Sequence, residues 1–150
     1  MRNSTKIIGI IGVSMLILVV LFAIFGPIIS PYDAYKQVGA SFLAPNKSHW
    51  LGTNDMGQDI LSELAVGART SLFIGVVAAI LATTIGGIMG VLAGYIGGRF
   101  EMIVMRVIDV VMTLPFLPLM IVVAVYIGPG VMTQIFVITL VMWAGKARQI

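Results

Sequence analysis

The chain has 150 residues, of which 59% are hydrophobic and only 10% are charged, and its formal net charge is +3. A soluble domain carries charge on roughly a quarter of its residues, so this composition excludes an ordinary soluble domain and indicates a membrane protein. Cysteine is absent, which excludes disulfides, thiolate metal sites and cysteine nucleophiles.

The first predicted element is a membrane-spanning helix over residues 7–29. This run contains no charged residue and exceeds the roughly 20 residues that a helix needs to cross the hydrocarbon core. A cleaved signal peptide is the alternative, because Arg2 and Lys6 precede the run. The run is longer than a signal h-region of about 7 to 15 residues, and no small-x-small cleavage site follows it. We therefore interpret it as an uncleaved anchor.

A polar, turn-rich segment follows at residues 31–70. Asp55, Asp59 and Glu63 recur there at every fourth position, with apolar residues between them. This pattern predicts an amphipathic helix that begins near residues 53–54 and lies along the membrane surface. Three carboxylates on one helix face could hold a divalent metal, but oxygen-only ligation beside a single histidine is a weak signature. A solvated face is the interpretation that we favour.

The second predicted span covers residues 71–97 and carries small residues at every fourth position. These residues are Ala82, Gly86, Gly90, Gly94 and Gly98. Small side chains at this spacing let another helix approach closely, because packing replaces the missing hydrophobic driving force in lipid. The alternative is that glycine is simply common in membrane helices. The recurrence in register favours a helix-packing surface.

The third predicted span, over residues 103–127, contains two unusual features. Arg106 and Asp109 are three positions apart on one helix face, which predicts an ion pair near the inner membrane surface; a proton relay is the alternative. Pro115 and Pro118 each remove one helical hydrogen bond, so the helix is expected to bend or unwind there. Such a break can line a substrate path or be a static kink.

A fourth span over residues 131–147 follows a turn at residues 128–130. The sequence therefore predicts an all-α, polytopic membrane protein with about four transmembrane helices. We divide it into an N-terminal anchor at 1–30, an extracytoplasmic segment at 31–70 and the remaining three helices at 71–150. Positive residues cluster at alternate ends of the spans, so the positive-inside rule places the N-terminus in the cytoplasm. This distribution of positive residues between the two sides of the membrane explains the net charge better than nucleic-acid binding does.

No catalytic constellation is present in the sequence. The one histidine has no partner motif, and neither G-x-S-x-G nor H-E-x-x-H occurs. Around Gly145-Lys146 a Walker A loop is missing, because Leu140 and Ala147 replace its glycine and its hydroxyl residue. We expect no catalytic residue, no metal site and no cofactor bound by this chain. Any energy from ATP must then come from another subunit.

From His49 to Leu72 the chain resembles the outer motif of the inner-membrane permeases of ABC importers for oligopeptides, dipeptides and nickel, specifically the second of the two paired permeases. The matching motif positions are Gly52, Asp55, Gly57, Asp59, Gly67 and Arg69. Further matches follow in order at 93–98, 105–109, 115–119, 128–129 and 143–148, so the resemblance covers nearly the whole chain. The chain departs from the pattern at Asn54, Gln58 and Glu63, where the family often has Asp, Arg and Arg.

The resemblance implies part of a six-helix permease in the cell membrane of a prokaryote, where substrate passes between two permeases by alternating access. It implies a second permease subunit, two ATP-binding subunits that hold ATP and Mg, and an extracytoplasmic solute-binding protein as partners, and no nucleic acid. Such permeases are about twice as long, and this chain ends at Ile150, where the family's ATPase-coupling loop would begin. We therefore expect residues 1–150 alone not to support ATP-coupled transport.

Two functions of other classes stay open at this point. A self-contained small membrane protein with a helix-packing or assembly role is compatible with the glycine positions and the short length. An intramembrane enzyme is disfavoured, because no nucleophile is paired with a base. Importers of peptides, nickel and some sugars share the outer motif, so the motif indicates the transport class and leaves the cargo to the binding protein.

Overall fold

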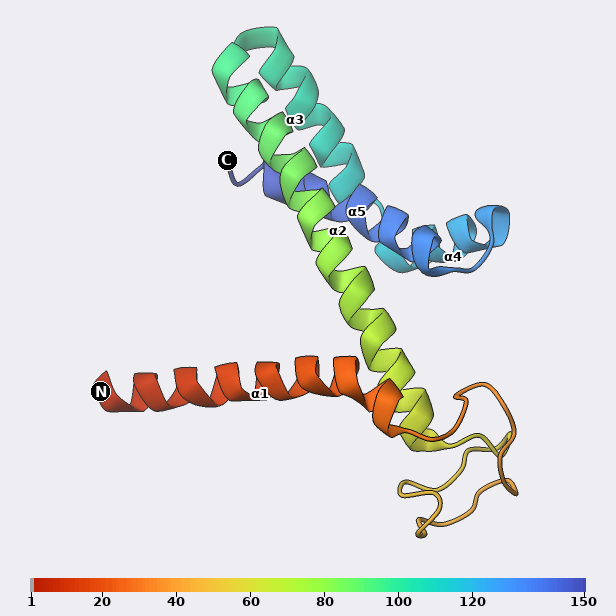
Figure 1. Cartoon of the computed structure of the whole chain (residues 1–150). Coiled ribbons are helices and arrows are strands. Elements are labelled where there is room, and N and C mark those ends of the chain that lie inside the picture. Colours follow the sequence, from red (N-terminus) through yellow and green to blue (C-terminus); the bar gives the residue numbers. More distant parts are fainter. Residues whose placement is uncertain (1) are drawn as a thin grey trace. The chain divides into compact units, whose positions relative to one another are not determined.

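The computed structural model describes residues 2–150, and all regular structure in that range is helical apart from one isolated antiparallel bridge between Thr53 and Asp59. Its five helices, drawn in Figure 1, are α1 (Arg2–Ile29), α2 (Ile60–Ile96), α3 (Gly98–Thr113), α4 (Phe116–Ile127) and α5 (Val131–Ala147). The expected all-α class is confirmed. The chain divides into two compact units, one up to Leu72 and one from Phe73 onward, and each is described by itself.

Two of the described helices are long and apolar enough to cross a membrane. They are the 24 residues Lys6–Ile29 of α1 and the 37 residues of α2. The helices α3 and α4 meet the same criterion only as a pair, and α5 is apolar but shorter. At about 1.5 Å per residue, α2 is roughly 55 Å long, well beyond the ~30 Å hydrocarbon core. Part of α2 must therefore tilt or project beyond the core.

The helix expected near residues 53–54 does not form there, and α2 begins at Ile60 instead. Asp55 lies in the turn before the helix, so the three acidic residues do not share one helix face. The physical reason is local turn geometry. The Asn54 side-chain oxygen accepts the amides of Met56 and Gln58, each at 2.9 Å, and Gly57 has a φ of +72° that no helix contains.

The end of α1 packs closely against the start of α2 in the first unit. A Cβ atom placed on Gly26 would lie 2.9 Å from the Cβ of Ala65, which is closer than two carbon atoms approach in real structures. Ala65 and the nearby Ala23 are buried. Because Gly26 and Ala65 are small, the two helices approach closely here, with the Phe22 ring beside the contact. Residues 60–70 therefore form the first turns of α2 and not a separate surface helix.

The helix expected over residues 103–127 is two helices, bent by 86° at the break between α3 and α4. Leu114 is extended, with a φ of −68° and a ψ of 127°, as the residue before a proline tends to be. Pro115 follows as the N-cap of α4. Pro118 lies in the first turn of α4, where its missing amide removes no helical hydrogen bond. The break thus arises at Pro115.

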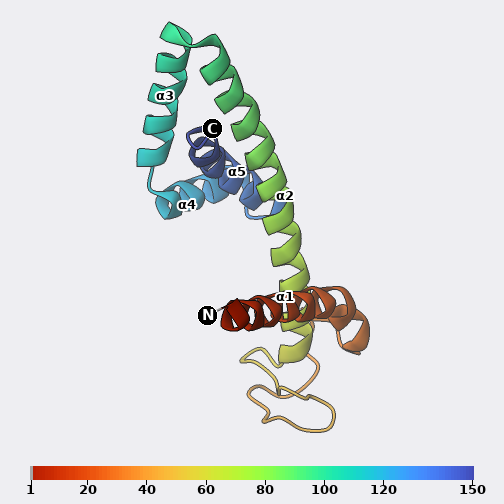
Figure 2. The same cartoon turned by 90° about the vertical axis from the view of Figure 1, so that its left-hand side faces the viewer.

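The core of the second unit lies where α3, α5 and the C-terminal half of α2 meet. Figure 2 shows α5 between the other two helices. The buried residues of this core are Ala93, Val104, Ile108, Ala144 and Ala147. Three of these five side chains are alanine, so the helices approach closely and the contact depends on backbone proximity more than on large interdigitating side chains.

Candidate functional site

The polar segment, which we define as residues 30–59, is organised around the buried side chain of Thr53. The Thr53 hydroxyl donates to the carbonyl oxygen of Ala40 at 2.6 Å and accepts the amide of Leu43 at 2.9 Å. Thr53 is only 3% exposed, so both hydrogen bonds are shielded from water. Together with the backbone hydrogen bonds from the Thr53 amide to Leu43 and from the Phe42 amide to Asn54, this hydroxyl holds two stretches of the segment side by side.

Two glycines of the outer motif are required by the backbone of the polar segment. Gly52 has a φ of +78°, and a Cβ there would lie 2.2 Å from the carbonyl oxygen of Leu43. Gly57 has a φ of +72°, and its Cβ would lie 2.3 Å from the carbonyl oxygen of Gly39. Both the left-handed conformation and the close backbone contact exclude a side chain. These two motif positions therefore define the shape of the segment.

A buried hydrogen-bond network joins the polar segment to α1 and α2. Asp59 Oδ1 accepts the ring Nδ1 of His49 at 3.0 Å, and Asp59 Oδ2 accepts both the amide and the hydroxyl of Ser62, at 2.9 and 2.8 Å. The Ser62 hydroxyl also contacts the hydroxyl of Ser30, which follows α1. Asp59 is therefore the N-cap of α2 and the central acceptor of the network.

Ser62, His49 and Asp59 are the residue types of a hydrolase triad, but their geometry is different. In a triad the serine bonds the histidine, whereas here Ser62 and His49 each bond a separate oxygen of Asp59. An ionised carboxylate only accepts hydrogen bonds, so the His49 Nδ1 carries the proton that it shares with Asp59. The arrangement orients three side chains without activating a nucleophile. It agrees with a structural role for the network.

Acidification is expected to loosen the polar segment only at low pH. Burial of Asp59, the largest single influence, opposes ionisation, but the hydrogen bonds from Ser62 and His49 outweigh it and lower the pKa of Asp59 below its ordinary value of 3.8. The stability that an ionised Asp59 contributes is therefore fully present above about pH 4 and is lost as the pH falls through the lowered pKa. Hydrogen exchange of residues 30–59 between pH 7 and pH 3 measures this loss.

The Asp59→Asn variant is the control for this pH dependence. Asparagine does not titrate, so the variant should not show the loss of protection at low pH that Asp59 causes. A loss of protection in the wild type that begins near pH 6 would contradict the assignment to Asp59.

The three positions that depart from the family pattern contact one another. The Asn54 amide nitrogen donates to Gln58 Oε1 at 2.8 Å and to Glu63 Oε2 at 3.0 Å. The three departures are therefore one substituted cluster and not three separate changes. In this chain the cluster is a Glu63 carboxylate with two amide neighbours.

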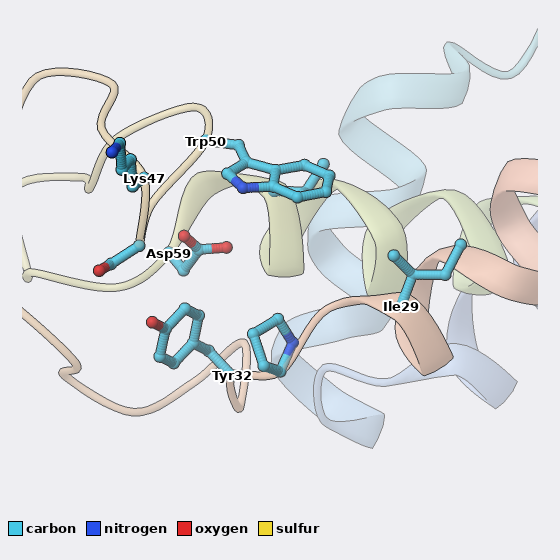
Figure 3. A pocket seen from close by; sticks show the side chains of 8 residues that line it. Ile29, Tyr32, Lys47, Trp50 and Asp59 are labelled. Carbon is cyan, nitrogen blue, oxygen red and sulfur yellow. The ribbon is translucent and has the colours of Figure 1, made fainter.

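A cavity of about 390 Å³ opens beside this network. Figure 3 shows the Asp59 carboxylate between the indole of Trp50 and the ring of Tyr32, with Lys47 and Ile29 also on the wall. The Tyr32 ring in turn lies against His49, with their centroids 4.7 Å apart. The cavity thus has a cationic, an anionic and an aromatic wall.

The remaining motif residues lie outside the network. Asp55 is exposed in the turn, and Gly67 and Arg69 lie on α2, where a Cβ on Gly67 would meet no atom within 4 Å. Sequence reasoning missed Thr53 and Ser62 as site residues. An aspartate at the N-cap of a helix accepts the amide of the residue three positions later. This rule relates Asp59 to Ser62, so the sequence could have predicted Ser62. The contact between His49 and Asp59 had no local signal.

The predicted series of small residues does not lie on one helix, because α2 ends at Ile96 and Gly98 begins α3. Its members also lie in different surroundings. A Cβ on Gly86 would lie 2.5 Å from the carbonyl oxygen of Trp143, and a Cβ on Gly90 would lie 2.7 Å from that of Ala147. Ala82 is also buried, but a Cβ on Gly94 or Gly98 would meet nothing within 4 Å. The end of α5 thus packs on the middle of the predicted surface, and the structure brings no chain segment to its last two positions.

Asp109 pairs with Arg148 and not with Arg106, so the predicted ion pair is wrong in its partner. Arg148 Nη1 lies 3.1 Å from Asp109 Oδ1, and the two side chains are 55% and 44% exposed. The same Arg148 nitrogen also lies 3.7 Å from the sulfur of Met112. Because α5 runs beside α3, a residue from the end of α5 reaches Asp109. The pair joins two helices that the chain places far apart in sequence.

We expect the Asp109–Arg148 pair to contribute about 1 kcal/mol or less to stability, because both side chains are partly exposed. A double-mutant cycle of Asp109→Asn with Arg148→Gln, measured by unfolding in detergent, should give a coupling of that size. The matched cycle with Arg106→Gln should give no coupling. Coupling to Arg106 instead would contradict the pairing.

Among the described residues, no group of three histidine, aspartate, glutamate or cysteine side chains is close enough to hold a metal ion. Asp55, Asp59 and Glu63, the set that the sequence offered for a metal, are dispersed over a turn, a helix cap and the first turn of α2. The spacing of four that suggested a common face therefore has no structural counterpart.

The comparisons with known proteins agree on one class. The family model described as the N-terminal TM domain of oligopeptide transport permease C matches residues 7–47. The dipeptide transport system permease protein DppC of Bacillus subtilis is 39% identical over 98% of this chain and 46% of its own length. The oligopeptide transport system permease protein OppC of the same organism is 38% identical over 99% of this chain and 49% of its own length.

A relative with lower identity is also named as a peptide transport permease. The probable D,D-dipeptide transport system permease protein DdpC of Escherichia coli K12 is 33% identical over 85% of this chain and 43% of its own length. The chain thus spans about half the length of the curated relatives that it matches.

Proposed function

The chain belongs to the family of oligopeptide and dipeptide transport permeases, and we propose that it forms part of the membrane-spanning permease of an ATP-binding-cassette importer for peptides. One observation carries this proposal: relatives named as peptide transport permeases match 98% and 99% of the chain at 39% and 38% identity. The apolar helices α1 and α2 supply the membrane setting that such a subunit needs. Nickel and sugars, the other cargoes suggested by the motif, are in none of these relatives' names.

In the proposed importer this chain contributes structure to the translocation path and does no chemistry of its own. ATP and Mg are held by separate ATP-binding subunits, whose binding and hydrolysis of ATP shift the permease between inward-open and outward-open states. A second permease subunit supplies the opposite wall of the path. The absence of a Walker A pattern around Gly145-Lys146 supports this division of labour.

The polar segment is the proposed extracytoplasmic face, with the N-terminus in the cytoplasm of a prokaryotic cell. The distribution of positive residues along the sequence supports this sidedness. Large apolar side chains stand out from the segment, among them Phe42 at 77%, Trp50 at 65% and Met56 at 65% exposed. Exposed aromatic residues on a structured loop are typical of recognition surfaces, so the segment is suited to receive a solute-binding protein.

The experiment is to express tagged residues 1–150 together with the other subunits of a peptide importer, purify the chain in detergent and identify what copurifies. The expected result is recovery of the second permease. A tagged unrelated membrane protein of similar size is the control for incidental capture. Recovery of the chain alone or as a homo-oligomer would contradict the proposal and favour an assembly role.

A further inference from the structure

The cavity beside Asp59 joins wall chemistries that the structural network does not use. Lys47 brings a cation, Asp59 a carboxylate, and Trp50 and Tyr32 bring aromatic rings. Ile29 and Leu61 add apolar surface from the ends of two helices. A ligand that matches all of these walls must carry a positive group, a negative group and hydrocarbon.

Asp59 retains capacity for one more hydrogen bond. It accepts three already: one from His49 on Oδ1, and two from Ser62 on Oδ2. An ionised carboxylate has about four acceptor positions, so one position on Oδ1 is unused. Asp59 is 2% exposed and yet forms part of the cavity wall. The remaining acceptor position is thus in a sheltered place where a donor gains more than it would in water.

The aromatic wall suits the same positive group. A cation over the face of a tryptophan is attracted by the ring quadrupole, and tryptophan is the best of the aromatic residues for this contact. Trp50 is 65% exposed, so its indole is accessible to a ligand. In Figure 3 the indole and the Asp59 carboxylate lie on the same cavity, so one ammonium group can contact both.

The cavity lies where two apolar helices end. Ile29 is the last residue of the candidate span Lys6–Ile29, and Leu61 is the second residue of α2. As the last residue of a candidate span, Ile29 lies at the level of the lipid headgroups, and Leu61 lines the same cavity. A ligand in this cavity therefore has its polar part at the Asp59 side and its hydrocarbon part along the helix ends.

We propose that this cavity binds the headgroup of an ammonium-bearing phospholipid, such as phosphatidylethanolamine. The ammonium lies between Trp50 and Asp59, the phosphate pairs with Lys47, and an acyl chain follows Ile29 and Leu61. A free peptide offers the same ammonium beside an anionic carboxylate, but it brings no acyl chain to the helix ends. The inference depends on the membrane setting and the cavity, and it does not rest on the proposed transport function.

The test titrates purified residues 1–150 in detergent with dioctanoyl phosphatidylethanolamine, dioctanoyl phosphatidylglycerol and dialanine, and counts bound molecules by native mass spectrometry. Phosphatidylglycerol has the phosphate and the chains but no ammonium, and dialanine has the ammonium but no chains. The expected result is that phosphatidylethanolamine binds about tenfold more tightly than phosphatidylglycerol, because one sheltered ammonium contact is worth roughly that factor. Dialanine should bind more weakly than either lipid.

The variants Trp50→Ala and Lys47→Ala should each weaken phosphatidylethanolamine binding by about three- to tenfold. Both side chains are exposed, so the fold should persist, which circular dichroism checks. The matched controls Tyr35→Ala and Lys36→Ala remove an exposed aromatic residue and an exposed cation of the same segment outside the cavity, and they should leave binding unchanged.

Three results would overturn the proposal. Equal binding of the two lipids would mean that the ammonium is not recognised. Binding of dialanine without phosphatidylethanolamine would assign the cavity to peptides. Equal weakening by the control variants would mean that lipid adsorbs to the segment as a whole.

Discussion

Replacing Asp59 by alanine is expected to unfold the polar segment and fray the start of α2. The substitution removes the N-cap of α2 and leaves the amide and hydroxyl of Ser62 and the ring Nδ1 of His49 without their acceptor. A buried donor without a partner costs about 1 to 3 kcal/mol, and a lost cap adds about 1 kcal/mol. Since these effects share one site, we expect a total loss of about 3 kcal/mol or more.

The measurement is hydrogen exchange of residues 30–66 in detergent, together with the urea midpoint. Asp55→Ala is the matched control, because Asp55 has the same side chain, lies four residues earlier in the same motif and is exposed. The control should change stability by less than about 0.5 kcal/mol. If both variants lose protection equally, the special role of the Asp59 network is refuted.

Replacing Gly86 or Gly90 by leucine is expected to separate α5 from α2. A Cβ alone would already lie 2.5 Å from the Trp143 carbonyl oxygen at position 86 and 2.7 Å from the Ala147 carbonyl oxygen at position 90. These contacts involve backbone, which cannot move aside as a flexible side chain does. Overpacking costs about 1 to 3 kcal/mol where the neighbours can adjust, and more where they cannot. We expect the upper end of this range or beyond.

Gly94→Leu is the matched control for both leucine variants. It lies on the same helix, belongs to the same series of small residues and would meet no atom within 4 Å. Thermal unfolding in detergent should separate Gly86→Leu and Gly90→Leu from Gly94→Leu by several degrees, because the cost falls on a small domain. Equal unfolding temperatures would show that α5 does not pack on these glycines.

The helices that the sequence predicts best are those whose signal lies in one uninterrupted apolar run. The span expected over residues 131–147 coincides with α5 (Val131–Ala147), and the span at 7–29 lies within α1. In such runs the membrane leaves the backbone only one regular structure. The break at Pro115 was also accessible from the sequence, because proline restricts its own backbone and that of Leu114.

In the polar segment, the spacing of charged residues does not predict the secondary structure. A spacing of four between Asp55, Asp59 and Glu63 fits a helix wheel, but it fits a turn followed by a helix cap equally well. Turn chemistry decided the outcome, since Asn54 and Gly57 form a turn that ends before the helix begins. The Asn54-to-Gly57 pattern is the turn signal in the sequence, and the charge spacing does not contain it.

Contacts between distant parts of the chain could not be predicted at all. Asp109 had a plausible partner three residues away, yet its partner is Arg148 at the end of another helix. Likewise, the series from Ala82 to Gly98 indicates a smooth helix face but not how much of it a neighbour covers. The end of α5 near Ala147 determines that. Both outcomes depend on helix packing, which no local pattern encodes.

The bend between α3 and α4 restricts what can surround it in a membrane. Where one helix ends and another begins, the last carbonyl groups and the first amides have no intrahelical partner. In hydrocarbon each such group costs several kcal/mol, so lipid tails cannot surround a break of 86°. If α3 and α4 together form one span, Leu114 and Pro115 must face protein or ordered water. The bend is therefore the one place in this helix pair that lipid tails cannot cover.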